Sequence, residues 1–306
     1  MPMCSASELS RRRFIGGMAA AAFAGPLPVR EVAPGVFVHR GPYQEANRDN
    51  GGAIANSGFI VGADAVAVID SGGSVGEGEA LRAAIGSVTD RPIAYVINTH
   101  FHPDHIFGDS VFTGAKVVAH HNMARALAAR GGFYLQRAKE EIGPAAEGLT
   151  VIPPDIAVER DLLLDLGRRT LLLQAWPTAH TDCDLTVRDQ RSDSWFLGDL
   201  LFVERMPTID GSLRGWIDVL NRLRREKAAR AVPGHGPETV DWPRASDALL
   251  RYLDGLAKAV KRALAAGLSL REATEQVGRE LKGKWALFDE VHPRNVAVAY
   301  AELEWE

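Results

Sequence analysis

The chain has 306 residues, of which 46% are hydrophobic, 24% charged and 7% aromatic, and it contains two cysteines. These values exclude a disordered, collagen-like or disulfide-stabilised protein, and they leave one large α/β domain or two smaller domains. The formal net charge of −4 lacks the basic excess that a phosphate backbone requires, so we expect no nucleic-acid partner.

Residues 1–24 have the pattern of a twin-arginine-type export signal. Arg11, Arg12 and Arg13 precede a short apolar stretch that ends in small residues at Ala24. The apolar stretch is shorter than the roughly 20 residues that span a bilayer as a helix, so we expect cleavage and no stable membrane anchor. The pattern predicts a periplasmic protein. A cytoplasmic protein with a basic tail remains the alternative.

The first half of the remaining chain alternates β-rich runs with helical patterns. Strands are predicted at residues 36–38, 53–61, 65–69 and 93–97, and a helix is predicted at 79–85. The segment 121–147 has a helical composition. We expect Gly131 and Gly132 to divide it into two helices.

A second β-rich series begins after Pro154. It comprises strands at residues 156–158, 162–166, 170–175, 185–187, 195–197 and 231–232, with a helix at 213–227. Two further helices are predicted beyond Pro243, at 249–264 and 270–281. Two β-rich halves, each closed by helices, predict an α/β fold with two face-to-face sheets and outer helices. We expect residues 25–306 to form one domain that includes the C-terminal helices.

Three of the nine histidines and one aspartate follow the predicted strand 93–97 within a few residues: His100, His102, Asp104 and His105. A strand that ends before this run delivers the first two imidazoles to one cavity, and Pro103 stiffens the turn behind them. Imidazole and carboxylate ligands suit Zn²⁺ and also Fe or Mn. Four clustered ligands, with others from elsewhere in the chain, exceed the needs of one tetrahedral metal. The run therefore predicts two metal ions.

The run 100–105 resembles the signature of the metallo-β-lactamase-fold hydrolases, and three further motifs follow in family order at 179–182, 198–199 and 233–236. The resemblance implies a four-layer αββα sandwich with the metal site along one sheet edge. It also implies seven ligands. His100, His102 and His180 would bind the first metal, Asp104, His105 and His235 would bind the second, and Asp199 would bridge both.

A narrower resemblance connects the chain to the quinoprotein relay system zinc metallohydrolases. It rests on the leader and on the segments 198–203, 210–216 and 288–295. This resemblance implies a periplasmic context beside quinone-dependent dehydrogenases, and it implies no substrate.

The expected ligand set leads to a hydrolytic mechanism. Metal binding lowers the pKa of water from about 15.7 to about 7, which supplies a bridging hydroxide as nucleophile at neutral pH. Asp104 is the predicted catalytic residue, because it can orient that hydroxide and transfer a proton to the leaving group. The sequence contains no Gly-x-Ser-x-Gly elbow and no phosphate-binding glycine loop, so competing enzyme classes lack their own motifs.

Three residues are predicted to contact a small-molecule substrate. Tyr43 lies in the glycine-rich segment 41–52, which resembles the flap of this fold, and Tyr134 lies in the helical insertion. His292 belongs to the C-terminal motif and is expected to approach the pocket. Cys183, close to His180, is expected to be a buried bystander.

The leading interpretation is an exported dinuclear zinc hydrolase that acts on an ester, thioester, lactone or amide bond. A β-lactamase is a second interpretation, although Asp199 occupies the position at which dedicated lactamases of the family carry cysteine or serine. An iron dioxygenase with the same ligands is a third. The fourth is a non-catalytic accessory protein that matures a quinoprotein, which retained function in His102→Ala would support.

Overall fold

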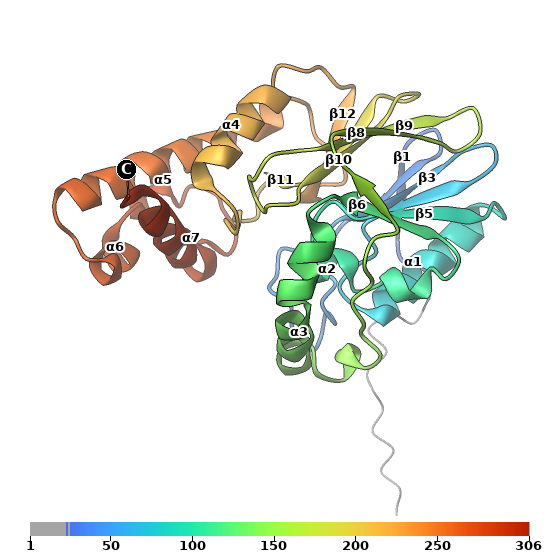
Figure 1. Cartoon of the computed structure of the whole chain (residues 1–306), viewed down its shortest axis with the longest axis horizontal. Coiled ribbons are helices and arrows are strands. Elements are labelled where there is room, and N and C mark those ends of the chain that lie inside the picture. Colours follow the sequence, from blue (N-terminus) through green and yellow to red (C-terminus); the bar gives the residue numbers. More distant parts are fainter. Residues whose placement is uncertain (1–22, 24, 306) are drawn as a thin grey trace, which may run out of the picture.

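The computed structural model describes residue 23 and residues 25–305. The predicted export signal therefore lies outside the described residues, apart from Phe23. In the described chain, two β-sheets lie face to face and helices cover their outer faces (Figure 1). The predicted four-layer αββα sandwich is confirmed.

The first sheet has seven strands in the order β1-β2-β3-β4-β5-β6-β7. Its strands are β1 Arg30–Ala33, β2 Val36–His39, β3 Ser57–Val61, β4 Val66–Ile69, β5 Ile93–Ile97, β6 Lys116–His120 and β7 Ile156–Val158. Strands β4 to β7 are parallel, and helices connect them. These connections are α1 Val75–Val88, α2 Pro103–Ile106, the 3₁₀ turn Asp109–Val111, α3 Met123–Glu141 and the 3₁₀ turn Gly143–Ala146.

The second sheet has five strands in the order β12-β11-β10-β9-β8. Its strands are β8 Asp161–Asp165, β9 Thr170–Ala175, β10 Leu185–Asp189, β11 Ser194–Phe202 and β12 Arg230–His235. Strands β11 and β12 are parallel and are joined through helix α4 Leu213–Leu223. The predicted ligand His235 is the last residue of β12, and β5 leads into the segment that carries His100 and His102.

Three helices follow the second sheet and extend from one side of the sandwich, on the left of Figure 1. They are α5 Asp247–Ala265, α6 Leu270–Gln276 and α7 Phe288–Leu303, with short 3₁₀ turns at Arg244–Ser246 and Arg279–Leu281. One continuous apolar cluster connects them to β11 and α4 through Trp195, Trp216, Leu253 and Val296. None of the described helices is long and apolar enough to cross a membrane.

The apolar layer between the sheets takes side chains from both. Ile60, Ile97 and Val118 of the first sheet pack against Leu173 and Phe196 of the second, and all are nearly inaccessible to solvent. A second apolar layer lies between the first sheet and α1, where Phe59 and Leu81 are fully buried. Each sheet is thus covered on both faces, as a four-layer sandwich requires.

Three predictions about individual elements were wrong. The helix predicted at 270–281 ends at Gln276, and a 3₁₀ turn follows Gly278, which has φ +72°. The strand 156–158 belongs to the first sheet beside β6, instead of opening the second series. Helix α3 continues through Gly131 and Gly132 without a break. Two helical glycines cost about 1 kcal/mol each relative to alanine, and the alanine-, leucine- and charge-rich flanks overcome that cost. At Gly131 a Cβ would lie 3.1 Å from the Val151 side chain, so the glycine permits close packing there.

Candidate metal centre

Four predicted ligands form a first cluster in which the ligand atoms lie within 4.8 Å of one another: His100, His102, His180 and Asp199. The Nδ1 atom of His102 lies 3.0 Å from His100 Nε2 and 3.1 Å from His180 Nε2. These nitrogens converge on one point. A divalent cation bound by imidazole nitrogens and a carboxylate oxygen fits this donor set.

Asp104, His105 and His235 form a second cluster under the same criterion. Asp104 Oδ2 lies 3.6 Å from His105 Nε2 and 3.3 Å from His235 Nε2. Asp199 connects the clusters. Its Oδ2 is 3.4 Å from both His180 Nε2 and His235 Nε2, and its Oδ1 is 3.4 Å from His105 Nε2. The structure thus brings all seven predicted ligands together.

Strand ends and close backbone contacts position these ligands. His100 and His102 follow β5, and Pro103 opens α2, which carries Asp104 and His105. Asp199 lies within β11, where the pairing with β12 is irregular at Gly198. Gly198 has φ +51°, and a Cβ there would lie 2.6 Å from Thr99, so this position favours glycine.

The second ring nitrogen of every ligand histidine has its own partner. His180 Nδ1 donates to Thr208 O at 2.7 Å, and His235 Nδ1 donates to Ile54 O at 2.9 Å. The other three contacts are His105 Nδ1 with Asp70 at 2.8 Å, His102 Nε2 with Asp210 at 3.0 Å and His100 Nδ1 with Thr99 Oγ1 at 3.0 Å. Such outer partners fix the tautomer and aim the opposite nitrogen at the cluster, as in metal sites.

The protonation states of His100, His180 and Asp199 also suit metal ligands. Burial lowers the pKa of His180 to about 3 and lowers the pKa of His100 well below its ordinary value, so both rings are neutral. Burial alone would raise the pKa of Asp199, but the imidazoles of His235 and His105 hold it well below its usual range. Two buried atoms, His105 Nε2 and Asp199 Oδ1, have no hydrogen-bond partner among the described residues. Buried groups of this kind need a partner, and a metal ion fits.

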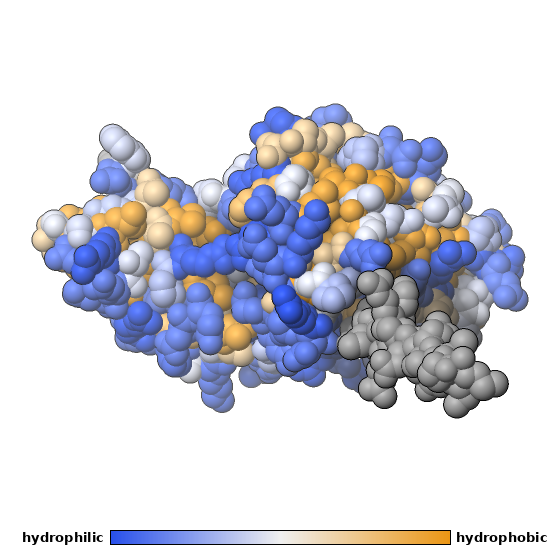
Figure 2. Space-filling model, turned by 90° about the horizontal axis from the view of Figure 1, so that it is seen from below, coloured by the Kyte–Doolittle hydropathy of each residue, from blue (hydrophilic) through white to orange (hydrophobic). Residues whose placement is uncertain are grey.

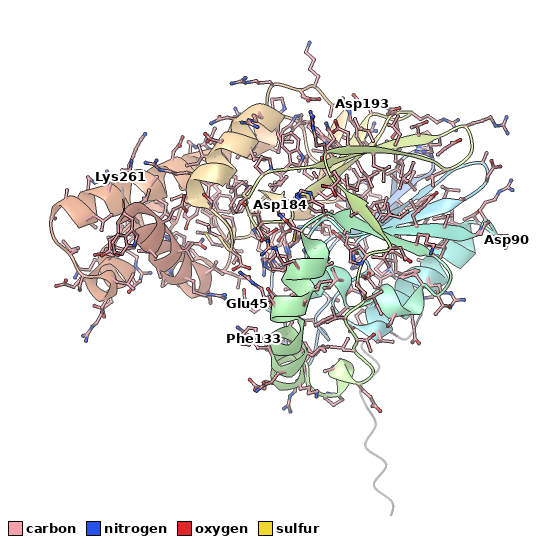
Figure 3. The ribbon with its side chains drawn as sticks, in the orientation of Figure 1. Glu45, Asp90, Phe133, Asp184, Asp193 and Lys261 are labelled. Atoms are coloured by element: carbon pink, nitrogen blue, oxygen red, sulfur yellow. The ribbon has the colours of Figure 1, made fainter. Side chains whose placement is uncertain are left out.

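A cavity of about 620 Å³ opens beside the clusters, in the size range of small-molecule sites. Asp104, Asp199 and His235 reach it from the metal centre, and α3 contributes the rings of Phe133 and Tyr134 together with charged side chains. In Figure 3, Glu45 and Phe133, both part of the lining, lie beside α3 on the side of the C-terminal helices. Figure 2 shows mainly hydrophilic residues on the underside between those helices and the sandwich.

The residues predicted to contact substrate lie in three different environments. Tyr134 lines the cavity, and burial raises the pKa of its hydroxyl to about 12. Tyr43 is outside the lining and donates to Glu204 Oε2 at 2.7 Å. His292 is also outside it, fully buried in α7, where it contacts Tyr252 Oη at 2.9 Å and Val277 O at 2.8 Å.

Cys183 is fully buried in the apolar cluster that includes Phe101 and Met123. It belongs to neither group of candidate ligands. Burial raises the pKa of its thiol. The side chain therefore has the environment that we expect of a bystander.

Sequence reasoning did not identify Asp70 and Asp210 as partners of the ligand histidines. Asp70 directly follows β4 and accepts hydrogen bonds from Thr99 as well as from His105. Asp210 accepts from His102 and also pairs with Arg130 of α3. The position of Asp70 at the end of an apolar strand is a signal that could have drawn attention to it, because it shares the sheet edge with His100.

Known structures of low sequence identity share this fold. A metallo-β-lactamase from Pontibacter korlensis superimposes with a TM-score of 0.60 at 20% identity, covering 74% of this chain and 99% of that chain. The stereoselective inverting sec-alkylsulfatase Pisa1 from Pseudomonas sp. gives a TM-score of 0.67 at 16% identity and covers 90% of this chain. That match extends over 50% of the sulfatase, so this chain spans about half its length.

A search of curated proteins found no match. A family model described as "Metallo-beta-lactamase superfamily" matches residues 50–235, which contain all seven predicted ligands. The predicted membership of the metallo-β-lactamase-fold metallohydrolases is confirmed, while the narrower quinoprotein relay system group remains a prediction. The chain belongs to the metallo-β-lactamase superfamily.

Proposed function

We propose that the protein is an exported dinuclear zinc hydrolase that cleaves an ester, thioester, lactone or amide bond in a small molecule. The observation that carries this proposal is the position of Asp199. Its carboxylate lies within 3.6 Å of imidazole nitrogens from both ligand clusters, as a bridging ligand requires. Each ion would have four protein ligands, three of its own and the shared Asp199, and expansion to five-coordination would admit water or substrate.

Two divalent ions held in this way would lower the pKa of bound water to about 7 and supply a hydroxide nucleophile at neutral pH. Asp104 is the carboxylate that both belongs to a ligand cluster and reaches the cavity with a partly exposed side chain. We assign it the proton transfer, in which its free oxygen accepts a proton from the nucleophile and returns it to the leaving group. Tyr134, protonated at neutral pH, offers a hydroxyl donor on the α3 wall.

We also propose the periplasm as the site of action, on the basis of the arginine-rich leader in residues 1–24. The segments 198–203, 210–216 and 288–295 support a place beside quinone-dependent dehydrogenases through their resemblance to the quinoprotein relay system group. Fusion of residues 1–24 to a reporter that is active only in the periplasm, with Arg11 and Arg12 changed to lysine as control, tests the export route.

The experiment that tests the hydrolytic centre is metal analysis of the protein purified without added metal. We expect about two zinc ions per chain in the parent and fewer than one and a half in Asp199→Ala. Asp182→Ala is the matched control, because Asp182 lies two residues beyond His180, belongs to neither ligand cluster and pairs with Arg125. The Asp182→Ala variant should retain two zinc ions per chain.

One iron or manganese per chain in the parent, or full metal content in Asp199→Ala, would overturn the dinuclear zinc proposal. If two zinc ions are found, hydrolysis should be assayed on esters, thioesters, lactones, amides and β-lactams. Full biological function in His102→Ala together with no hydrolysis would instead indicate an accessory protein.

A further inference from the structure

Four arginines line the cavity beside the metal centre: Arg130, Arg137, Arg205 and Arg294. The first two have carboxylate partners on the cavity wall, because Arg130 pairs with Asp210 and Arg137 pairs with Glu141. Arg205 and Arg294 differ from them. Their surroundings leave positive charge available inside the cavity.

Arg205 is a buried cation whose donors are largely unused. Its side chain is 6% exposed, and only Nη2 has polar contacts, with Gln44 O at 3.3 Å and Glu45 Oε1 at 3.5 Å. Both distances are long for charge-assisted hydrogen bonds. Nε is buried without a partner, and within the described chain Nη1 makes no hydrogen bond or ion pair. Glu45 is 53% exposed, so solvent weakens its attraction to the guanidinium.

Arg294 is exposed on α7 and faces the same cavity. The described residues provide it with no hydrogen bond or ion pair. An exposed arginine without a partner is ordinary on a protein surface. Here it lines the same cavity as a second arginine whose charge is poorly compensated.

The two arginines belong to one wall. Asn295, the neighbour of Arg294, accepts from Ile209 N at 3.0 Å and donates to Pro207 O at 2.7 Å. The backbone beside Arg205 is tied to the segment that precedes α7, because Met206 N donates to Ala286 O at 2.9 Å. These bonds hold the loop after β11 and the helix α7 together. The rings of Phe133 and Tyr134 come from a different element, α3.

We propose that this wall binds an anionic oxygen group of the substrate, a carboxylate or a sulfate, through Arg205 and Arg294. The substrate is then a small amphipathic anion whose apolar part lies against α3 while its scissile bond reaches Asp104 and Asp199. Planar guanidinium groups match the geometry of such oxygens. This proposal rests on the proposed hydrolytic centre for the position of the scissile bond, but the anion site can be measured without turnover.

The test is calorimetric titration of the zinc-supplemented full chain with three six-carbon probes: hexanoate, hexyl sulfate and neutral hexan-1-ol. We expect at least one anion to bind about tenfold or more tightly than the alcohol. Arg205→Met and Arg294→Met should each weaken anion binding about tenfold and change alcohol binding less than twofold, since each removes charge-assisted hydrogen bonds. Arg125→Met, which removes an exposed arginine that pairs with Asp182 outside the cavity lining, is the matched control and should keep the parent affinity.

Equal anion affinity in the parent and in the Arg205 and Arg294 variants would overturn the proposal, because the anions would then contact only the metal ions. If Arg205→Met does not fold, the exposed Arg294 decides the matter, and Arg205→Lys shows whether charge alone suffices. The ratio of hexanoate to hexyl sulfate affinity identifies the preferred group. Arginine-dependent binding without two zinc ions would reject the proposed function and retain the anion site. Two zinc ions with anion binding that does not depend on the arginines would reject the anion site and retain the proposed function.

Discussion

Arg169 joins the two sheets at the start of β9, at the opposite end of that strand from the loop that carries His180. Its side chain is 2% exposed and donates to both carboxylate oxygens of Asp189, at 3.0 Å and 2.7 Å. Its Nη1 also donates to Val61 O of β3 at 2.8 Å. One guanidinium therefore connects β3 of the first sheet to β10 of the second.

Arg169→Met should lower the free energy of unfolding by about 3–5 kcal/mol, because it leaves the Asp189 carboxylate buried without its cation. Burial would raise the pKa of Asp189, but the Arg169 and Ser192 hydrogen bonds lower it below its usual value. The stabilisation is therefore present above the unfolded pKa of about 3.9 and is lost as the pH falls below it. Urea denaturation at pH 7 measures the effect.

Arg125→Met is the control for this measurement. Arg125 is 68% exposed and pairs with Asp182 at the surface, so its loss should change stability by less than about 1 kcal/mol. Equal losses in the two variants would show that the buried pair contributes no more than a surface pair.

The ligand histidines could be predicted from sequence because their spacing is local and their motifs follow strand ends. The residues that complete the site could not be predicted in this way. Asp210 contacts His102 across 108 positions, and Arg205 becomes a cavity residue only because the loop after β11 meets α7. Tyr43 and His292 had suggestive motifs, but their hydrogen-bond partners hold them outside the cavity lining.

Helix α7 stabilises helix α4 through a single side chain, Glu302. Its carboxylate accepts hydrogen bonds from Leu213 N at 2.7 Å and Arg214 N at 3.1 Å, and from Ser212 Oγ at 2.9 Å. A negative charge at a helix N-terminus is favourable, because the first backbone N–H groups of the helix lack intrahelical partners. The C-terminal helix therefore supplies part of the N-cap of α4.

Glu302→Gln should reduce the free energy of unfolding by about 1–2 kcal/mol, since the amide removes the charge and one acceptor oxygen from this cap. The midpoint of thermal or urea unfolding reports the change. Glu304→Gln removes an exposed charge from the same end of the chain and should stay within about 0.5 kcal/mol of the parent. Equal free energies of unfolding in Glu302→Gln and Glu304→Gln would show that Glu302 does not stabilise α4 as part of its N-cap.

At the scale of elements, the sequence predicted several strands closely but did not predict the 16-residue helix α7. The predicted strands 93–97 and 170–175 match β5 and β9, whereas β6, which ends at His120, was not predicted. The predicted strand 195–197 covers only the first part of the nine-residue β11. A glycine followed by an aspartate is typical of a strand end, but here parallel pairing with β12 continues the strand to Phe202.

At the scale of the molecule, the ligand clusters join the two sheets. His100 to His105 follow β5 of the first sheet, while Asp199 and His235 come from β11 and β12 of the second. The sandwich architecture could be predicted from the alternation of strands and helices. The position of the C-terminal helices beside the cavity depends on the shared apolar cluster with Trp216 and Leu253, which pairs residues too distant for a local pattern.

Because a metal ion in this site would bind residues of both sheets, chelation should destabilise the whole fold. We expect the melting temperature of the zinc-loaded protein to fall by about 10 °C with excess EDTA and to recover with added zinc, since ligands that bind only the native state stabilise it. Differential scanning calorimetry measures the shift. Asp199→Ala should show a much smaller shift, and an unchanged melting temperature in the parent would contradict a metal that joins the sheets.

The buried thiol of Cys183 can report how often the protein around it opens. A fully buried thiol with a raised pKa does not react while the surrounding apolar cluster is closed. In a Cys4→Ser chain it is the sole cysteine, so the rate at which a thiol reagent modifies it counts the openings of the cluster. Because Cys183 is three residues after His180, the modification rate measures local opening of the segment that carries this candidate metal ligand.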